Sequence, residues 1–199
     1  MSELQSWADS AATLVDTAMG RAKADMVIRK GRWVNVHSGE IIPGTDIAIA
    51  AGRFAYVGPD ASHAIGPATQ VIEADGRYLV PGLCDGHMHV ESGMVTVTEF
   101  ARAVIPHGTT SMFIDPHEIA NVLGVDGIHF MRENGARTPF KFCWGAPSCV
   151  PATCFETAGA TVSPADVRDL FARGEVGYLS EVMNYPGVLA GDPDLLAKI

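Results

Sequence analysis

Strand-like and helix-like segments alternate along most of this chain, beginning at Leu79. Four apolar, strand-like runs are each followed by a stretch typical of a helix, and these runs cover residues 79–91, 109–115, 140–148 and 176–184. Such alternation is typical of parallel sheets in which helices connect successive strands. The pattern therefore predicts an α/β fold, arranged either as a doubly wound sheet or as a (β/α) barrel.

Capping residues mark where the predicted helices begin. Thr96 precedes one helical stretch and has Glu99 three residues later, which is the spacing of a capping box. Ser163 stands directly before Pro164, a combination expected at an N-cap and the first helical position. An Asp-Pro pair at 192–193 predicts the start of a fourth helix.

Polar side chains gather near the carboxyl end of each predicted strand. They are His87, His89, Asp115, His117, Glu118, Ser148, Glu181 and Asn184. Functional side chains occupy this end of the strands in a (β/α) barrel, so their position favours the barrel. A complete barrel takes about 250 residues, so the chain after Leu79 has room for only about the first four of eight β/α units.

The segments before Leu79 do not show this alternation of strands and helices. Residues 1–23 predict a helix, whose apolar face would comprise Leu4, Trp7, Ala11, Leu14, Val15 and Ala18. Residues 24–78 contain short β-rich pieces separated by turn signals, which predicts a small β-sandwich domain. We therefore expect a helix at 1–23, a sandwich region at 24–78 and the first half of a barrel at 79–199.

Composition excludes several classes of function. The formal charge of −9 and the lack of clustered Lys and Arg argue against a nucleic-acid binder. No run approaches the roughly 20 apolar residues of a membrane-spanning helix, and the first residues do not form a signal peptide. The four cysteines have no paired-motif spacing, which is typical of reduced thiols in a cytoplasmic protein.

His87 and His89 are the first candidates for metal ligands. Residues i and i+2 of a strand point to the same face, so both imidazoles would aim at one point. Glu181 lies in an otherwise apolar strand, where an unpaired carboxylate would be costly, so a metal or another cation is expected beside it. Asp115 and Glu118 could serve the same site, or could merely cap the following helix.

A zinc-deaminase motif is a competing interpretation. Cytidine-type deaminases carry H-x-E followed by P-C-x-x-C, and this chain contains His89 and Glu91 followed by Cys149 and Cys154. The spacing does not match, because the proline is not adjacent to Cys149 and the two cysteines are five residues apart. We therefore do not expect this type of zinc site.

Longer phrases indicate a family. The segment VPGLCDGHMHVES behind a β-rich lead-in resembles the amidohydrolase superfamily, in which the first barrel strand carries His-x-His and the barrel joins a small β-sandwich. Four further phrases are similar to the adenine deaminases of that superfamily: HVESGMVTVTEFARAVIPHGTT, DPHEIANVLG, SCVPATCFETAGA and EVMNYPGV. The resemblance extends from about residue 24 to residue 199.

The resemblance implies a binuclear divalent metal centre, with Mn²⁺ favoured over Fe²⁺ or Zn²⁺. His87 and His89 match the first-strand ligands, and Glu181 matches a carboxylate that bridges the two ions. A water of lowered pKa would attack C6 of adenine, giving hypoxanthine and ammonia. Asp115, His117 and Glu118 match the family's DPHE segment and are candidates for substrate contact or proton transfer. The family also implies a homo-oligomer when the protein is full length.

Length is the main departure from that family, whose members are about three times as long. Further histidine ligands and a late aspartate base are expected on later strands, so we expect this chain to be an amino-terminal portion or a truncated gene product. Two alternatives stay open. One is another cyclic amide or amidine hydrolase, such as a hydantoinase-like enzyme. The other is an inactive half-barrel fragment, whose exposed strand edges would favour aggregation.

Overall fold

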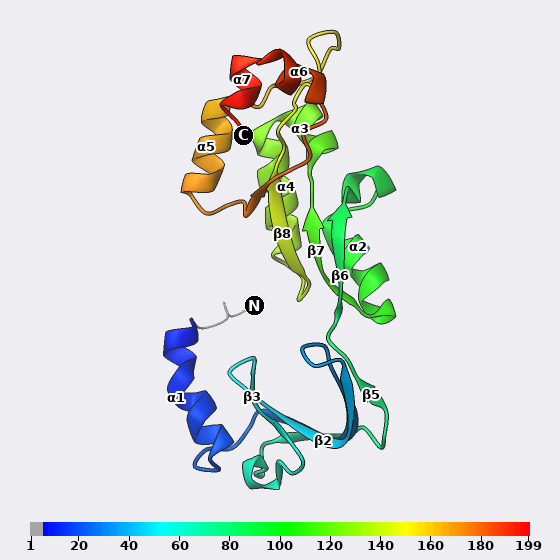
Figure 1. Cartoon of the computed structure of the whole chain (residues 1–199), viewed down its shortest axis with the longest axis vertical. Coiled ribbons are helices and arrows are strands. Elements are labelled where there is room, and N and C mark those ends of the chain that lie inside the picture. The colour runs from blue at the N-terminus through cyan, green and yellow to red at the C-terminus, as the bar shows by residue number, and fades with distance from the viewer. Residues whose placement is uncertain (1–5) are drawn as a thin grey trace. The chain divides into compact units, whose positions relative to one another are not determined.

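The structure, a computed structural model, describes residues 6–199 and divides the chain into two compact units (Figure 1). The first unit ends at Pro81, and the second covers Gly82–Ile199. Leu4, which the sequence assigned to the apolar face of the first helix, lies outside the described residues. Within the described part of the chain, no helix is long and apolar enough to cross a membrane.

The first unit contains one mixed sheet. Its strands are β1 (Met26–Asn35), β2 (Glu40–Ala50), β3 (Arg53–Gly58), β4 (Gln70–Glu73) and β5 (Tyr78–Leu79), and a short 3-10 turn, η1, covers Ser62–Ala64. The order is β3-β2-β1-β4, and β5 also pairs with β1. The β2–β3 hairpin turns through Ala51 and Gly52, which both have positive φ angles (51° and 68°), as a two-residue type I′ turn requires.

The core of this unit consists mainly of small side chains. Its buried members are Ala24, Val27, Ala48, Ala61 and Ala64. The first helix, α1 (Trp7–Ala18), packs against β2 and β3.

Among the described residues of the predicted apolar face of α1, only Leu14 is buried. The buried residues are Ser10, Leu14 and Thr17, whereas Trp7 and Val15 are 67% and 54% exposed. Ser10 and Thr17 are small enough to let the helix approach the sheet closely. Trp7 instead packs under the guanidinium of Arg53, which lies 4.3 Å from the centroid of the indole ring.

The second unit contains a parallel sheet with the strands in sequence order. The strands are β6 (Leu83–Met88), β7 (Thr109–Ile114), β8 (Lys141–Ala146) and β9 (Tyr178–Leu179). The helices are α2 (Val97–Val104), α3 (His117–Leu123), α4 (Val125–Gly135), α5 (Pro164–Ala172), α6 (Tyr185–Ala190) and α7 (Pro193–Leu196), with 3-10 turns η2 (Val90–Gly93) and η3 (Ile105–His107). Every neighbouring pair of strands is parallel, so each connection crosses over through helical segments.

One face of this sheet is buried under its helices. On β7, Met112 and Ile114 are buried at 1% and 0% exposure, while Phe113 between them is 40% exposed, because successive side chains of a strand point to opposite faces. Two core clusters fill the space between the sheet and the helices. The buried members of the first are Val90, Val97, Ala101, Met112, Ile114, Met131 and Phe140. Those of the second are Ala120, Ile128, Ala146, Val150, Val162, Val167, Leu170 and Val176. The curled parallel sheet and the separate mixed sheet confirm the predicted fold class: a partial (β/α) barrel with an N-terminal β-sandwich region.

Three predicted segments differ in detail. The run at 79–91 is divided at Pro81, and its first residue, Leu79, pairs with Trp33 of β1 in the sheet of the first unit. The helix-like stretch that follows the run at 109–115 is broken into α3 and α4 at Gly124, whose φ of 63° and ψ of −141° are accessible essentially only to glycine. The run at 176–184 forms a strand at only two residues, Tyr178–Leu179.

One of the predicted helix starts lacks the expected capping hydrogen bonds. Thr96 is the N-cap of α2, but its side chain makes no capping bond, and Glu99 pairs with Arg102 at 2.6 Å. The N-cap at Ser163 and the helix after Asp192 are confirmed.

The N-cap of α5 allows a stability test. Ser163 accepts the Asp166 N–H, and the Asp166 carboxylate accepts the Ser163 N–H, which is a complete capping box. We expect Ser163→Ala to lower the free energy of unfolding by about 1 kcal/mol, measured by chemical denaturation. Thr96→Ala is the matched control, because the Thr96 side chain caps no backbone amide. Equal losses in both variants would contradict the assignment.

Candidate metal centre

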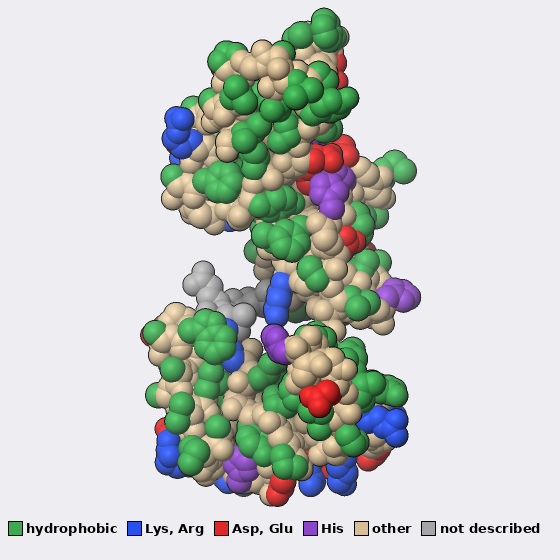
Figure 2. Space-filling model, viewed as in Figure 1, with side chains coloured by type: hydrophobic (Ala, Val, Ile, Leu, Met, Phe, Trp, Pro, Cys, Tyr) green, Lys and Arg blue, Asp and Glu red, His purple; other side chains and the backbone are tan. Residues whose placement is uncertain are grey.

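Four side chains meet at the carboxyl ends of the strands in the second unit. His87 lies in β6, His89 follows that strand, Asp115 follows β7, and Glu181 lies two residues after β9. One ligand atom from each of these residues lies within 4.8 Å of those of the other three. Figure 2 shows histidine and acidic side chains gathered together on this unit. Parallel pairing places these strand ends at a common edge, which brings together residues far apart in the sequence.

The two histidines point to one place, in the direction that the strand geometry indicates. Their Nε2 atoms are 2.9 Å apart. The Glu181 carboxylate faces both rings, with Oε2 3.7 Å from His87 Nε2 and Oε1 3.5 Å from His89 Nε2. Ligand nitrogens lie about 2.0–2.1 Å from a zinc ion, so two nitrogens at this separation can contact the same cation.

Asp115 provides the test of whether these residues suit a metal. Its side chain is fully buried, and within the described residues neither carboxylate oxygen accepts a hydrogen bond. Oδ1 lies 2.6 Å from His117 Nδ1, but the contact lacks hydrogen-bond geometry. A buried carboxylate without donors is unfavourable unless a cation neutralises it. Two imidazoles and two carboxylates suit Zn²⁺, Fe²⁺ and Mn²⁺, so the residues fit a divalent metal centre.

Glu118 contacts the far side of His89. Its Oε2 lies 3.0 Å from His89 Nδ1, and its Oε1 accepts the Ser92 hydroxyl at 2.8 Å. A carboxylate on one ring nitrogen fixes the tautomer and directs the other nitrogen outward, as is common behind metal-binding histidines. Here the Nε2 of His89 is directed at the cluster.

The charges around His89 shift several protonation equilibria. Burial alone would lower the pKa of His89, but the carboxylates of Glu118 and Asp115 outweigh it and raise that pKa. Burial also opposes ionisation of Glu118, yet the Ser92 hydroxyl and the nearby His89 lower the pKa of this carboxyl. Burial raises the pKa of Glu91, whose Oε1 accepts the Ile119 N–H at 3.2 Å.

His117 is enclosed on both sides of its ring. Its Nε2 accepts the Cys149 N–H at 3.3 Å, and its Nδ1 faces Asp115. The side chain is only 3% exposed. His117 is therefore buried in direct contact with the Asp115 carboxylate.

The sequence predicted the same role, substrate contact or proton transfer, for the three polar residues of the DPHE segment, but their contacts in the structure differ. Asp115 joins the donor cluster, His117 contacts Asp115, and Glu118 contacts His89 while its own side chain stays 49% exposed. Sequence reasoning did not identify Ser92 as a partner of Glu118. Ser92 and Glu118 are 26 residues apart and belong to different strand-to-helix connections, so no spacing in the sequence indicates this contact.

The zinc-deaminase alternative finds no support in these contacts. Glu91 accepts a hydrogen bond from the Ile119 N–H of α3, and Cys149 is buried while Cys154 is exposed. Neither cysteine belongs to the donor cluster found among the described residues.

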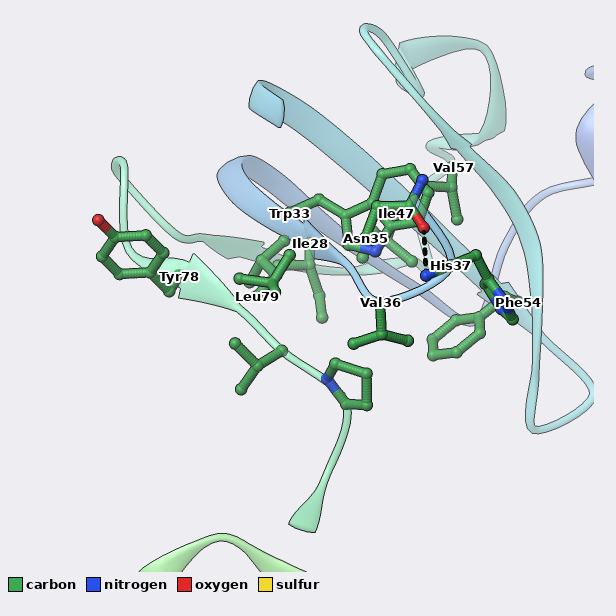
Figure 3. Close-up of a pocket in the computed structure, with 13 residues that line it drawn as sticks. Ile28, Trp33, Asn35, Val36, His37, Ile47, Phe54, Val57, Tyr78 and Leu79 are labelled. Carbon is green, nitrogen blue, oxygen red and sulfur yellow. Dashed lines mark hydrogen bonds between the residues drawn. The ribbon is translucent and has the colours of Figure 1, made fainter. Parts of the chain in front are cut away.

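The first unit has a cleft of a different character (Figure 3). Its volume is about 430 Å³, and its lining is mainly apolar, with Trp33, Phe54 and Tyr78 as the largest side chains. Its lining includes none of the four residues of the donor cluster. Its polar lining residues are Asn35, His37 and Tyr78, and its lining includes no carboxylate, so the metal cluster is the candidate site.

Comparisons with known proteins agree with this geometry. The chain is 62% identical over 197 residues to adenine deaminase 3 of Rhizobium meliloti, covering 98% of this chain and 33% of that protein. It is 64% identical over 194 residues to an adenine deaminase of Mesorhizobium japonicum, covering 97% of this chain and 32% of that one. The chain therefore spans about a third of the length of the curated relatives it matches.

A solved structure and a family model identify the fold and the family. An atrazine chlorohydrolase from Arthrobacter aurescens, complexed with zinc, aligns with a TM-score of 0.51 at 14% identity, over 75% of this chain and 42% of that chain. This likeness shows a shared fold. Residues 78–198 match the model of the amidohydrolase family. That match covers more than half of the chain and includes all four residues of the donor cluster, and the chain belongs to the amidohydrolase family.

Proposed function

We propose that this chain supplies part of the active site of an adenine deaminase, which hydrolyses adenine to hypoxanthine and ammonia. The observation that carries the proposal is the convergence of His87, His89, Asp115 and Glu181 at one end of the parallel sheet. The choice of substrate rests on the relatives, which bear the name adenine deaminase at 54–64% identity over nearly the whole chain.

The proposed reaction needs a nucleophile, ligands that hold the metal, and a route for protons. Divalent ions at the cluster would supply a water of lowered pKa, which is the nucleophile that hydrolytic deamination requires. In the net reaction, the oxygen of water becomes bonded to C6 of the purine, and the C6–N bond breaks with loss of ammonia. His87, His89, Asp115 and Glu181 would hold the metal.

Glu118 is the proposed proton-transfer group. Its side chain is half exposed and contacts His89 beside the cluster, so it can exchange protons with solvent close to the proposed site of reaction. His117 would act through Asp115 by fixing the orientation of that carboxylate, since both of its nitrogens face protein atoms.

The remaining parts of the proposal concern the setting of the enzyme. Mn²⁺ is the proposed metal, since two of the four residues in the cluster are carboxylates, which suit Mn²⁺, and selectivity follows geometry and supply as much as ligand type. All four cysteines are free, which suits a cytoplasmic enzyme. We also propose a homo-oligomer and a role in purine salvage.

The activity is tested directly on the protein at its full length. After loading with Mn²⁺, we expect stoichiometric ammonia and hypoxanthine from adenine, followed by an ammonia assay and by ultraviolet absorbance. Removal of the metal with a chelator is expected to abolish the activity, and Mn²⁺ should restore it. Turnover of a cyclic amide such as hydantoin, with none of adenine, would instead favour the alternative hydrolase.

The role of Glu118 has a separate test. Glu118→Gln keeps an oxygen that can accept a hydrogen bond from His89 but cannot carry a proton at neutral pH. We expect kcat to fall about 10²–10⁴-fold, the range for loss of a general acid or base, while the bound metal per protein stays unchanged by elemental analysis.

Glu133→Gln is the matched control for that test, because Glu133 is an exposed residue of α4 outside the cluster. It should leave kcat unaltered. A Glu118→Gln protein with normal kcat would exclude proton transfer by this residue.

A further inference from the structure

Glu181 lies just beyond the point where backbone pairing ends. The ladder between β8 and β9 joins Gly145 to Tyr178 and Ala146 to Leu179. One more backbone hydrogen bond follows, from the Ser180 N–H to the Ala146 carbonyl at 2.9 Å. The next residue after β8 is Pro147, which has no N–H to donate. The backbone that carries Glu181 must therefore be held by other groups.

Ser148 provides the hydrogen bond to that backbone. Its side chain is fully buried, and its hydroxyl donates to the Glu181 carbonyl oxygen at 2.7 Å. Within the described residues, the other side-chain contact of this hydroxyl is with the neighbouring Cys149 Sγ at 3.2 Å. A buried hydroxyl with one short bond to the backbone fixes that backbone, because breaking the bond would leave a polar group unpaired.

Neighbouring contacts also hold the segment that carries Ser148. Cys149 Sγ accepts the Asn184 N–H at 3.5 Å, and Lys198 Nζ donates to the Ser148 carbonyl at 3.0 Å. Gly145 allows the close approach on the other side, since a Cβ there would lie 2.1 Å from Ser180 Oγ. Side chains thus continue the connection between the β8 and β9 segments past the end of the ladder.

We propose that Ser148 is a positioning residue for the metal centre: its buried hydroxyl holds the Glu181 backbone so that the carboxylate faces His87 and His89. The inference rests on the proposed metal-dependent function. Metal–ligand distances tolerate deviations of only about 0.2 Å. Glu181 is on a segment with little regular structure of its own, so loss of the 2.7 Å bond would allow its carboxylate to move by more than that.

The test compares metal affinity in the full-length protein and its variants. Zn²⁺ affinity is measured by competition with a chromogenic chelator, and Co²⁺ substitution reports the coordination geometry through its visible absorption. We expect Ser148→Ala to weaken Zn²⁺ binding about 10–100-fold, the usual effect of removing a partner behind a metal ligand. The Co²⁺ spectrum should change as well. Ser148→Thr keeps the hydroxyl and should retain the wild-type affinity.

Ser163→Ala is the matched control, because it also replaces a serine that makes a hydrogen bond but lies at the N-cap of α5. It should lower thermal stability and leave Zn²⁺ affinity unchanged. Each variant is first checked by circular dichroism and its thermal midpoint, so that unfolding is not counted as loss of metal. Ser148→Ala with wild-type Zn²⁺ affinity and an unchanged Co²⁺ spectrum would overturn the positioning role. Failure of the wild-type protein to bind metal would instead overturn the proposed function.

Discussion

The parallel alignment of β6, β7, β8 and β9 is the constraint on which the candidate site depends. Because all four strands run in the same direction, their carboxyl ends lie along one edge, and the residues that follow them are brought together. Asp115 and Glu181 are separated by many residues in sequence, yet their carboxylates approach the same two imidazoles. If one of these strands ran antiparallel, its polar residues would lie at the opposite end of the sheet.

A second layer of contacts converts this proximity into defined orientation. Glu118, which accepts the Ser92 hydroxyl, contacts the ring of His89, His117 faces Asp115, and Ser148 donates to the backbone of Glu181. The buried Asp115 carboxylate makes no hydrogen bond in the described part of the chain, so a nearby positive charge would stabilise it. Burial alone would lower the pKa of His89, but the negative charges of Glu118, Asp115 and Glu181 raise it. The arrangement therefore favours a cation electrostatically as well as geometrically.

Several features of the fold could be predicted because they depend on local rules. The alternation of strand and helix patterns, the N-cap at Ser163 and the common direction of His87 and His89 all follow from residues near one another in sequence. Two predictions about helices were wrong, one because of a local backbone conformation and the other because of tertiary packing. A Gly-only conformation at Gly124 broke a predicted helix, and close packing buried Ser10 and Thr17 of α1 in place of Trp7.

The sequence by itself determined the family, the order of strands and helices, and three residues of the donor cluster, because motifs and periodicity are properties of neighbouring residues. Only the tertiary structure decided that Asp115 joins the cluster and that Glu118, His117 and Ser148 stand behind its members. The reason is that the approach of Asp115 to the two histidines, the contact of Glu118 with His89 and the bond from Ser148 to Glu181 each join different strand-to-helix connections. Hydrogen bonds between such connections depend on the register and curl of the sheet, which no local spacing specifies.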